Sequence, residues 1–248
     1  ISFFFFLFQG ASSLLDMILF YESTTHLDIS DNSSLGASGW RALAHLIKQG
    51  TLKTNRALKE LHLTNNLLNS YQDALHLGDL LRYNSTLQTL ELSNNAVADA
   101  LEELCDGLRW QTAGLKVLLL RNNQITVEGM HHLPGLKVLQ VLDLGANLLG
   151  NKGVQMIREP LMMNSSVLQL SLTQANITCE VVALAEFLAE SRQIQRLDLR
   201  QNEVKVGGLM ALSLALRINR SLARLDVDLT PSQEQDDNNN STANNHKH

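Results

Sequence analysis

The chain has 248 residues, of which 44% are hydrophobic and 18% are charged, and its formal net charge is −5. This composition supports a sizeable core and excludes disorder throughout, while the acidic balance argues against a nucleic-acid-binding protein. Two cysteines are too few for a disulfide framework and favour a reducing compartment, the cytoplasm first and the nucleus as the alternative. Leucine supplies 50 residues, which is typical of one short unit repeated many times.

Residues 1–8 (ISFFFFLF) form an apolar run ahead of the main body. Eight residues are too few to cross a bilayer, which needs about 20. No basic region precedes them, and Asp16 interrupts the next apolar stretch, so a signal peptide fits poorly. We expect this run to be a fragment edge or a mistranslated start.

Residues 9–228 carry the recurring pattern L-x-x-L-x-L-x-x-N-x-L. Its second leucine position falls at residues 27, 61, 90, 118, 142, 170, 197 and 225. Side chains alternate between the two faces of a strand, so both residues of each L-x-L step point to the same side. One unit cannot bury its apolar face alone, so neighbouring units must stack. The pattern predicts eight short parallel strands.

Intervals of about 28 residues leave room for a helix after each strand. Glu180–Glu190 and Leu209–Ile218 have apolar residues at helical spacing. The predicted fold is an α/β leucine-rich-repeat solenoid, or horseshoe, of about eight repeats, with an inner parallel β-sheet and outer helices. Three glycines are expected just ahead of helices and Pro160 is expected to end a helix before Leu161; the glycines are Gly129, Gly153 and Gly208.

Two intervals are irregular. The 24-residue interval from Leu118 to Leu142 predicts a shortened outer helix around His131–Gly135. The 34-residue interval before Leu61 holds Trp40–Lys48, which has the pattern of one repeat's helix, and Leu52–Asn55, which resembles the end of another. We therefore expect that repeats are missing at the junction between residues 50 and 51.

Residues 229–248 form a polar tail that we expect to be disordered, because it has too few apolar residues to offset its ordering entropy.

The residue between the two inward leucines of each strand is predicted to face the concave side, with arginines beside it toward the C-terminal half. This mixed-charge surface is either a platform for a protein partner or a surface kept solvated by the residues common at this strand position. The candidate residues are Asp28, His62, Glu91, Asp143, Asp198, Asp226, Arg121, Arg196, Arg200 and Arg224.

The asparagine of the pattern is expected to bond backbone groups where the chain leaves each strand, forming a ladder between neighbouring coils. Ala175 replaces it in one repeat. The ladder residues are Asn32, Asn66, Asn95, Asn123, Asn147 and Asn202.

No catalytic, metal or cofactor site is predicted, because the sequence has neither a glycine-rich phosphate loop nor Cys/His metal spacing. His62 beside Glu91 is expected to be an exposed cross-strand pair. Adjacent His131 and His132 point different ways on a helix and are expected at the surface. Both cysteines, Cys105 and Cys179, are expected to be buried in helical segments.

The repeat type resembles the intracellular ribonuclease-inhibitor-like superfamily. Within it, four segments resemble the protein phosphatase 1 regulatory subunit 37 family: Asp16–Ser30, Leu35–Lys48, Val181–Asn202 and Gly207–Leu225. The resemblance extends over about residues 9–228. It implies a repeat domain that binds the phosphatase catalytic subunit and lowers its activity. The family's short basic-Val-x-Phe docking motif and its long acidic C-terminal region are absent from this chain, which therefore looks like an incomplete member.

Three other classes compete with this interpretation. A Ran-type GTPase activator shares the repeat length, but we find no rim contact for a nucleotide switch. A ribonuclease inhibitor would be rich in cysteine. An extracellular repeat protein would have units of about 24 residues and cysteine-rich caps.

Overall fold

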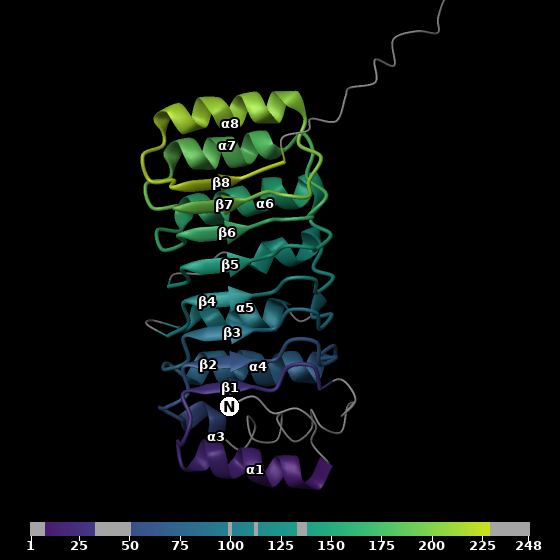
Figure 1. The fold of residues 1–248 in the computed structure, drawn as a ribbon, viewed down its shortest axis with the longest axis vertical. Helices are drawn as coiled ribbons and strands as arrows, with labels where there is room; N and C mark the ends of the chain where they lie inside the picture. The colour runs from purple at the N-terminus through teal and green to yellow at the C-terminus, as the bar shows by residue number, and fades with distance from the viewer. Residues whose placement is uncertain (1–7, 33–50, 99–100, 112–113, 133–137, 229–248) are drawn as a thin grey trace, which may run out of the picture.

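The computed structural model describes residues 8–32, 51–98, 101–111, 114–132 and 138–228. These residues form an eight-stranded parallel sheet in which the strands follow one another in chain order (Figure 1). The predicted leucine-rich-repeat solenoid is therefore confirmed. The strands are β1 (His26–Asp28), β2 (Glu60–His62), β3 (Thr89–Glu91), β4 (Val117–Leu119), β5 (Val141–Asp143), β6 (Gln169–Ser171), β7 (Arg196–Asp198) and β8 (Arg224–Asp226).

The register of the sheet follows the leucine pattern. The central residue of every strand is the second leucine of its repeat, and each pairs with the same leucine of the next strand. The backbone N–H of the third leucine position also donates to the following strand, as from Leu120 to the Asp143 carbonyl at 2.9 Å. The leucines therefore form one continuous row across the molecule.

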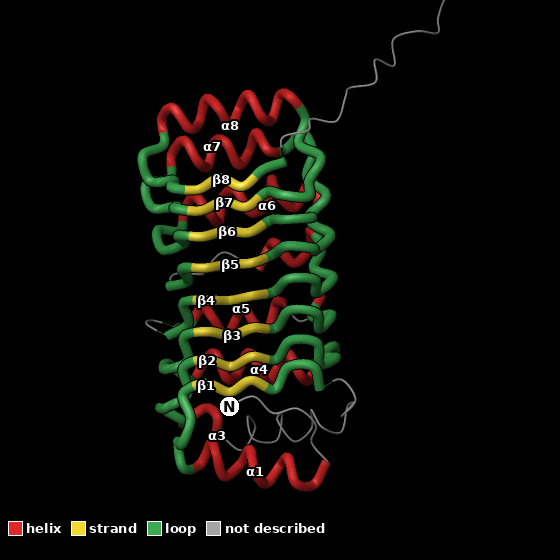
Figure 2. The backbone as a smooth tube through the Cα atoms, in the orientation of Figure 1, coloured by secondary structure: helices red, strands yellow, loops and turns green. Residues whose placement is uncertain are grey.

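Helices cover one face of the sheet (Figure 1). In the view of Figure 2, the row of helices extends beyond the row of strands at both ends of the stack, so the sheet lies on the inner, concave side. The helices are α1 (Phe8–Phe20), α3 (Thr51–Thr54), α4 (Tyr71–Tyr83), α5 (Leu101–Arg109), α6 (Gly150–Met163), α7 (Val181–Glu190) and α8 (Val206–Ile218), and the 3₁₀ helix is η3 (Val127–His132). None of the described helices is long and apolar enough to cross a membrane.

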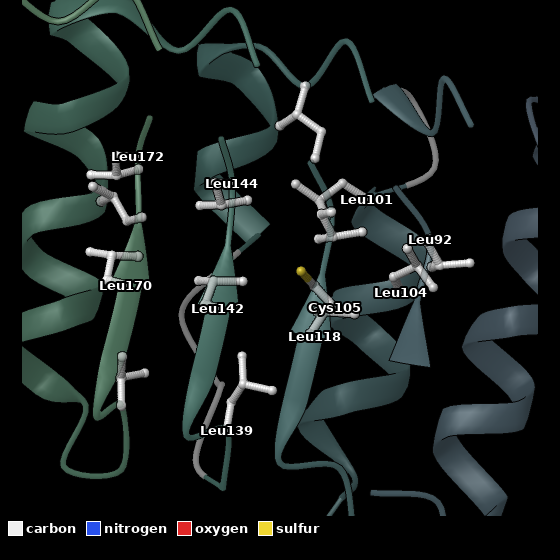
Figure 3. Packing of buried hydrophobic residues seen from close by; sticks show 14 of the residues in the cluster. Leu92, Leu101, Leu104, Cys105, Leu118, Leu139, Leu142, Leu144, Leu170 and Leu172 are labelled. Carbon is white, nitrogen blue, oxygen red and sulfur yellow. The ribbon is translucent and has the colours of Figure 1, made fainter. Parts of the chain in front are cut away.

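The core lies between the sheet and the helices. Leu118 and Leu142 project from β4 and β5 toward the helix layer, where Leu104 of α5 belongs to the same cluster (Figure 3). Each is no more than 1% exposed. Burial of one such side chain stabilises the fold by about 1.5–3 kcal/mol, and it depends on the neighbouring repeats.

Asparagine side chains join the coils at the end of each strand. The Asn123 side-chain oxygen accepts the backbone N–H groups of Asn95 and Val97, and its amide donates to the Leu92 carbonyl of the preceding repeat. The same arrangement recurs along the stack for Asn66, Asn95, Asn147 and Asn202. These asparagines are buried, so they satisfy turn groups that water cannot reach.

A second row of amide side chains lies at the opposite end of the strands and was not predicted. Asn84 donates to the carbonyls of Leu52 and Asn55, and its oxygen accepts the Leu87 N–H at 2.8 Å. Equivalent bonds are made by Asn55, Gln111 and Asn219. An asparagine three residues before the first leucine of a repeat is the sequence signal for this row.

Two expectations about helix ends are wrong. Pro160 lies inside α6, which continues to Met163, because the buried Leu161 holds the last turn against the core. Gly153 and Gly208 lie within the first turns of α6 and α8, and Gly129 lies in η3. Close packing explains Gly208: an added Cβ would come within 3.2 Å of both Val181 and Val204.

The shortened 24-residue repeat is built around η3, which replaces an α-helix and lies slightly before the predicted position. Residues 133–137 lie outside the described residues. The same is true of residues 33–50, so the helix expected at Trp40–Lys48 and the proposed junction stay predictions. In the structure β1 pairs directly with β2.

The predicted domain limits also stay predictions. Of the segment 1–8, only Phe8 is described, as the first residue of α1. Residues 229–248 lie outside the described residues.

Truncating an interior leucine should cost far more than truncating the same position at the end of the stack. We expect Leu118→Ala to lower the free energy of unfolding by about 2–5 kcal/mol. Leu225→Ala should cost less, because Leu225 is only partly buried. Urea unfolding of both variants tests this, and equal losses would contradict the nearest-neighbour account of stability.

The asparagine ladder can be tested with Asn123→Ala. Removal of the side chain leaves the N–H groups of Asn95 and Val97 without their bonds, at about 1–3 kcal/mol for each buried group. Asn69 is exposed, so Asn69→Ala is the matched control. Thermal and urea unfolding should separate the two variants clearly; similar stabilities would argue against the ladder.

Candidate protein-binding surface

The concave face is formed by the two residues on either side of each strand's central leucine. The central leucine packs toward the helices, so its neighbours face the opposite side of the sheet. The predicted column follows one register line across the eight strands: Asp28, His62, Glu91, Leu119, Asp143, Ser171, Asp198 and Asp226.

Several column carboxylates also bond their own turns. The Asp28 carboxylate accepts the Ser30 N–H at 3.0 Å, and Asp143 accepts the Gly145 N–H at 2.8 Å. Asp198 accepts the Arg200 N–H at 3.2 Å. An aspartate at this position therefore has a structural role in the turn two residues later, which explains part of its recurrence without any partner.

The N-terminal part of the face holds a chain of histidines and glutamates. His26 Nε2 lies 3.0 Å from Glu60, whose other carboxylate oxygen lies 3.4 Å from His62 Nε2. His62 Nδ1 lies 2.7 Å from Glu91. The predicted cross-strand pair of His62 and Glu91 is confirmed. Both side chains are only 26% exposed, so the pair is partly buried and less exposed than predicted.

The His62 imidazole is set up to carry a proton. Burial lowers the pKa of His62, but hydrogen bonds to Glu91 and Glu60 raise it, and the nearby charges of Glu91 and Asp28 add to them. The net result is a pKa above the ordinary value of 6.5. The negative charge of this end of the face therefore increases as the pH rises.

At the C-terminal part of the face, the carboxylates are paired with arginines. Arg200 lies 2.6 Å from Asp198, and Asp226 lies 3.1 Å from Arg196 and 2.9 Å from Arg224. Burial raises the pKa of Asp198, but the hydrogen bonds and charge of Arg200 outweigh it and hold that pKa below its usual value. The hydrogen bond from Arg224 likewise lowers the pKa of Asp226.

This pairing corrects the predicted surface at one residue. Asp198 is 5% exposed and belongs to an internal charge network, so it is not a free contact for a partner. Arg121, which follows β4, donates to the Thr173 hydroxyl.

Between the two charged parts lies a hollow of about 190 Å³. Its lining residues come from β4 to β7 and are Leu119, Val141, Leu142, Asp143, Gln169, Leu170, Ser171, Arg196 and Asp198. Leu119 was not among the predicted surface residues. The available signal was that β4 has apolar residues at both outward positions, Val117 and Leu119.

The described residues contain no group of three or more His, Cys, Asp or Glu side chains that could hold a metal. Cys105 is buried, and burial raises the pKa of its thiol to about 12. Cys179 is exposed and precedes α7, so its predicted burial in a helix is wrong. The side chains of His131 and His132 lie outside the described part of the chain.

Comparison with known proteins finds similarities that agree with the repeat architecture of the structure. The family model described as "Leucine Rich repeat" matches residues 83–100. Protein phosphatase 1 regulatory subunit 37 of Bos taurus is 42% identical over 177 residues, covering 50% of this chain and 25% of the relative. The resemblance to that family is confirmed over half of the chain, not over all of residues 9–228.

The chain thus spans about a quarter of the length of these relatives. The aligned length of 177 residues exceeds half of this 248-residue chain, so the relative has residues inside the matched region that this chain lacks.

Two further similarities cover more of the chain. NACHT, LRR and PYD domains-containing protein 5 of Mus musculus is 32% identical over 214 residues, covering 82% of this chain and 18% of the relative. Among solved structures, a chain of the yeast Rad7 and Elc1 complex has 16% sequence identity and a TM-score of 0.48. The match covers 81% of this chain and 57% of that chain.

The raised pKa of His62 makes the stability of the fold depend on pH. Its contribution is fully present below the unfolded pKa of about 6.5 and is lost as the pH rises through the higher folded pKa. We expect His62→Gln to remove the fall in the free energy of unfolding above about pH 6.5. The dependence of that free energy on pH in the acid range should stay unchanged. Urea unfolding from pH 5 to 9 tests it; parallel curves for the two proteins would show that His62 does not titrate as described.

Proposed function

We propose that this leucine-rich-repeat chain is a non-catalytic regulatory protein whose concave face binds the catalytic subunit of protein phosphatase 1 and lowers its activity. The observation that supports this most strongly is the 42% identity to proteins named as regulatory subunits of that phosphatase. The chain would act in the cytoplasm or the nucleus, in keeping with its two unpaired cysteines.

The geometry of the concave face supports a docking role. Eight strands in register hold their outward side chains on a single surface, since the inward leucines lock each strand against its neighbours. Charged side chains arranged on a rigid surface give specificity and a faster encounter with a complementary partner. Binding across such a surface would lower phosphatase activity by covering part of the catalytic subunit.

The proposal assigns binding to the repeat surface itself. Glu60 and Glu91 are suitable probes, because they lie on adjacent strands and their carboxylates pair with histidines within the described part of the chain. Reversing both charges changes the face without disturbing the leucine core.

Titration of the purified catalytic subunit with the full chain tests the proposal. We expect a saturable fall in dephosphorylation of a phosphopeptide. The Glu60→Lys/Glu91→Lys variant should be at least about tenfold weaker, since loss of close charge pairs across an interface costs about 1.5 kcal/mol or more. The matched control is Glu102→Lys/Glu159→Lys, which makes the same charge change at exposed positions of α5 and α6. Absence of both binding and inhibition at micromolar concentrations of the chain would refute the proposal.

A further inference from the structure

The hollow on the concave face lies where the polar surface of the sheet is interrupted. Val117, Leu119 and Val141 occupy outward positions of β4 and β5, and Val117 pairs with Val141 across the two strands. On every other strand of the described sheet, both outward residues are polar or charged. Other repeats therefore show that the fold does not need apolar residues at these positions.

The size of the hollow indicates what it can hold. About 190 Å³ is below the roughly 300–1,000 Å³ of small-molecule sites, so it suits one side chain of a protein better than a metabolite. Leu119 and Val141 line one part, and Gln169, Ser171 and Arg196 line another. An apolar pocket ringed by polar groups is the arrangement that anchors interface hot spots.

The charges next to the hollow differ on its two sides. On β1 to β3 the outward positions carry Asp28, Glu60 and Glu91, with histidines but no lysine or arginine. On β7 and β8 each outward aspartate is paired with an arginine. Among the described strands, the carboxylates without an arginine partner therefore gather on the N-terminal side, and Asp143 of β5 adds one more in the hollow itself.

We propose that this face binds an extended segment of a partner protein whose apolar side chain fills the hollow between Leu119 and Val141. Lysine or arginine side chains of the same segment lie over Glu60 and Glu91. This assignment rests on the docking role proposed above and specifies its partner chemistry.

Sheet geometry sets the spacing of the recognised residues. The apolar part of the hollow lies between Leu119 of β4 and Val141 of β5. Measured from there, β3 and β2 are one and a half and two and a half strand spacings away, or about 7 and 12 Å. An extended chain advances about 3.3 Å per residue. The basic residues should therefore lie about two to four positions from the apolar residue, in a segment that crosses the strands.

The test uses a hollow variant that the fold should tolerate. Leu119→Asp and Val141→Gln introduce the residue types that Asp143 and Gln169 place at the same positions of neighbouring strands. The matched control is Met163→Asp, which replaces an exposed apolar side chain on α6, outside the concave face. Circular dichroism and thermal unfolding check that all proteins are folded.

The probe is a displayed library of random dodecapeptides, selected on the full chain and measured afterwards by fluorescence anisotropy. We expect the enriched peptides to carry Lys or Arg two to four positions from Leu, Ile, Val, Met or Phe. Their affinity should fall about tenfold or more for Leu119→Asp/Val141→Gln, and also for Glu60→Gln/Glu91→Gln. It should be unchanged for Met163→Asp.

Three results would overturn the inference: no enrichment, enriched peptides without basic residues, or equal binding to the hollow variant. Phosphatase inhibition that persists in Leu119→Asp/Val141→Gln would contradict this inference and leave the docking role intact. Enrichment of the expected peptides, without any inhibition of the phosphatase, would contradict the proposed phosphatase regulation and leave this peptide-binding site intact.

Discussion

No repeat of this chain can bury its own leucines, and this constraint determines the rest of the structure. The three leucine-type positions of each interior repeat from β2 to β7 are almost completely buried, but only because another repeat lies on each side. In the last repeat, Leu222, Leu225 and Val227 are only partly buried, since nothing stacks beyond β8 among the described residues. Register, helix placement and the two rows of amide side chains all follow from the need to repeat one packing arrangement without a slip.

In this arrangement the residues that pack the core differ from the residues that can bind a partner. Since the inward leucines and the asparagine ladder carry most of the stability, the outward residues of each strand are freer to vary than the inward ones. The chain uses that freedom unevenly: histidines and carboxylates at β1 to β3, apolar residues at β4 and β5, and arginine–aspartate pairs at β7 and β8. Because the internal pairs neutralise one end, the net electrostatic character of the face comes from the other.

Sequence reasoning predicted the elements governed by period and missed those governed by contact. The leucine spacing placed all eight strands in register, and α7 begins one residue from its predicted start. The predictions for Pro160 and Cys179 are wrong. The packing of Leu161 keeps Pro160 inside α6, and Cys179 is exposed because it lies in the loop before α7. In the sequence Asp198 resembles the other surface carboxylates, yet it is buried and paired with Arg196 of its own strand and Arg200 of the turn that follows. The hollow arises from side chains on four strands, so no single repeat reveals it.

Amide hydrogen exchange resolved by residue tests the central claim of stacked, mutually dependent repeats most directly. Stability should be greatest in the interior and fall toward the ends, because each repeat draws its burial from its neighbours. The account predicts that the amides of Leu118 and Leu120 exchange at least about a hundredfold more slowly than those of Leu225 and Val227. Exchange in β4 as fast as in β8, or uniform protection along the whole sheet, would contradict it.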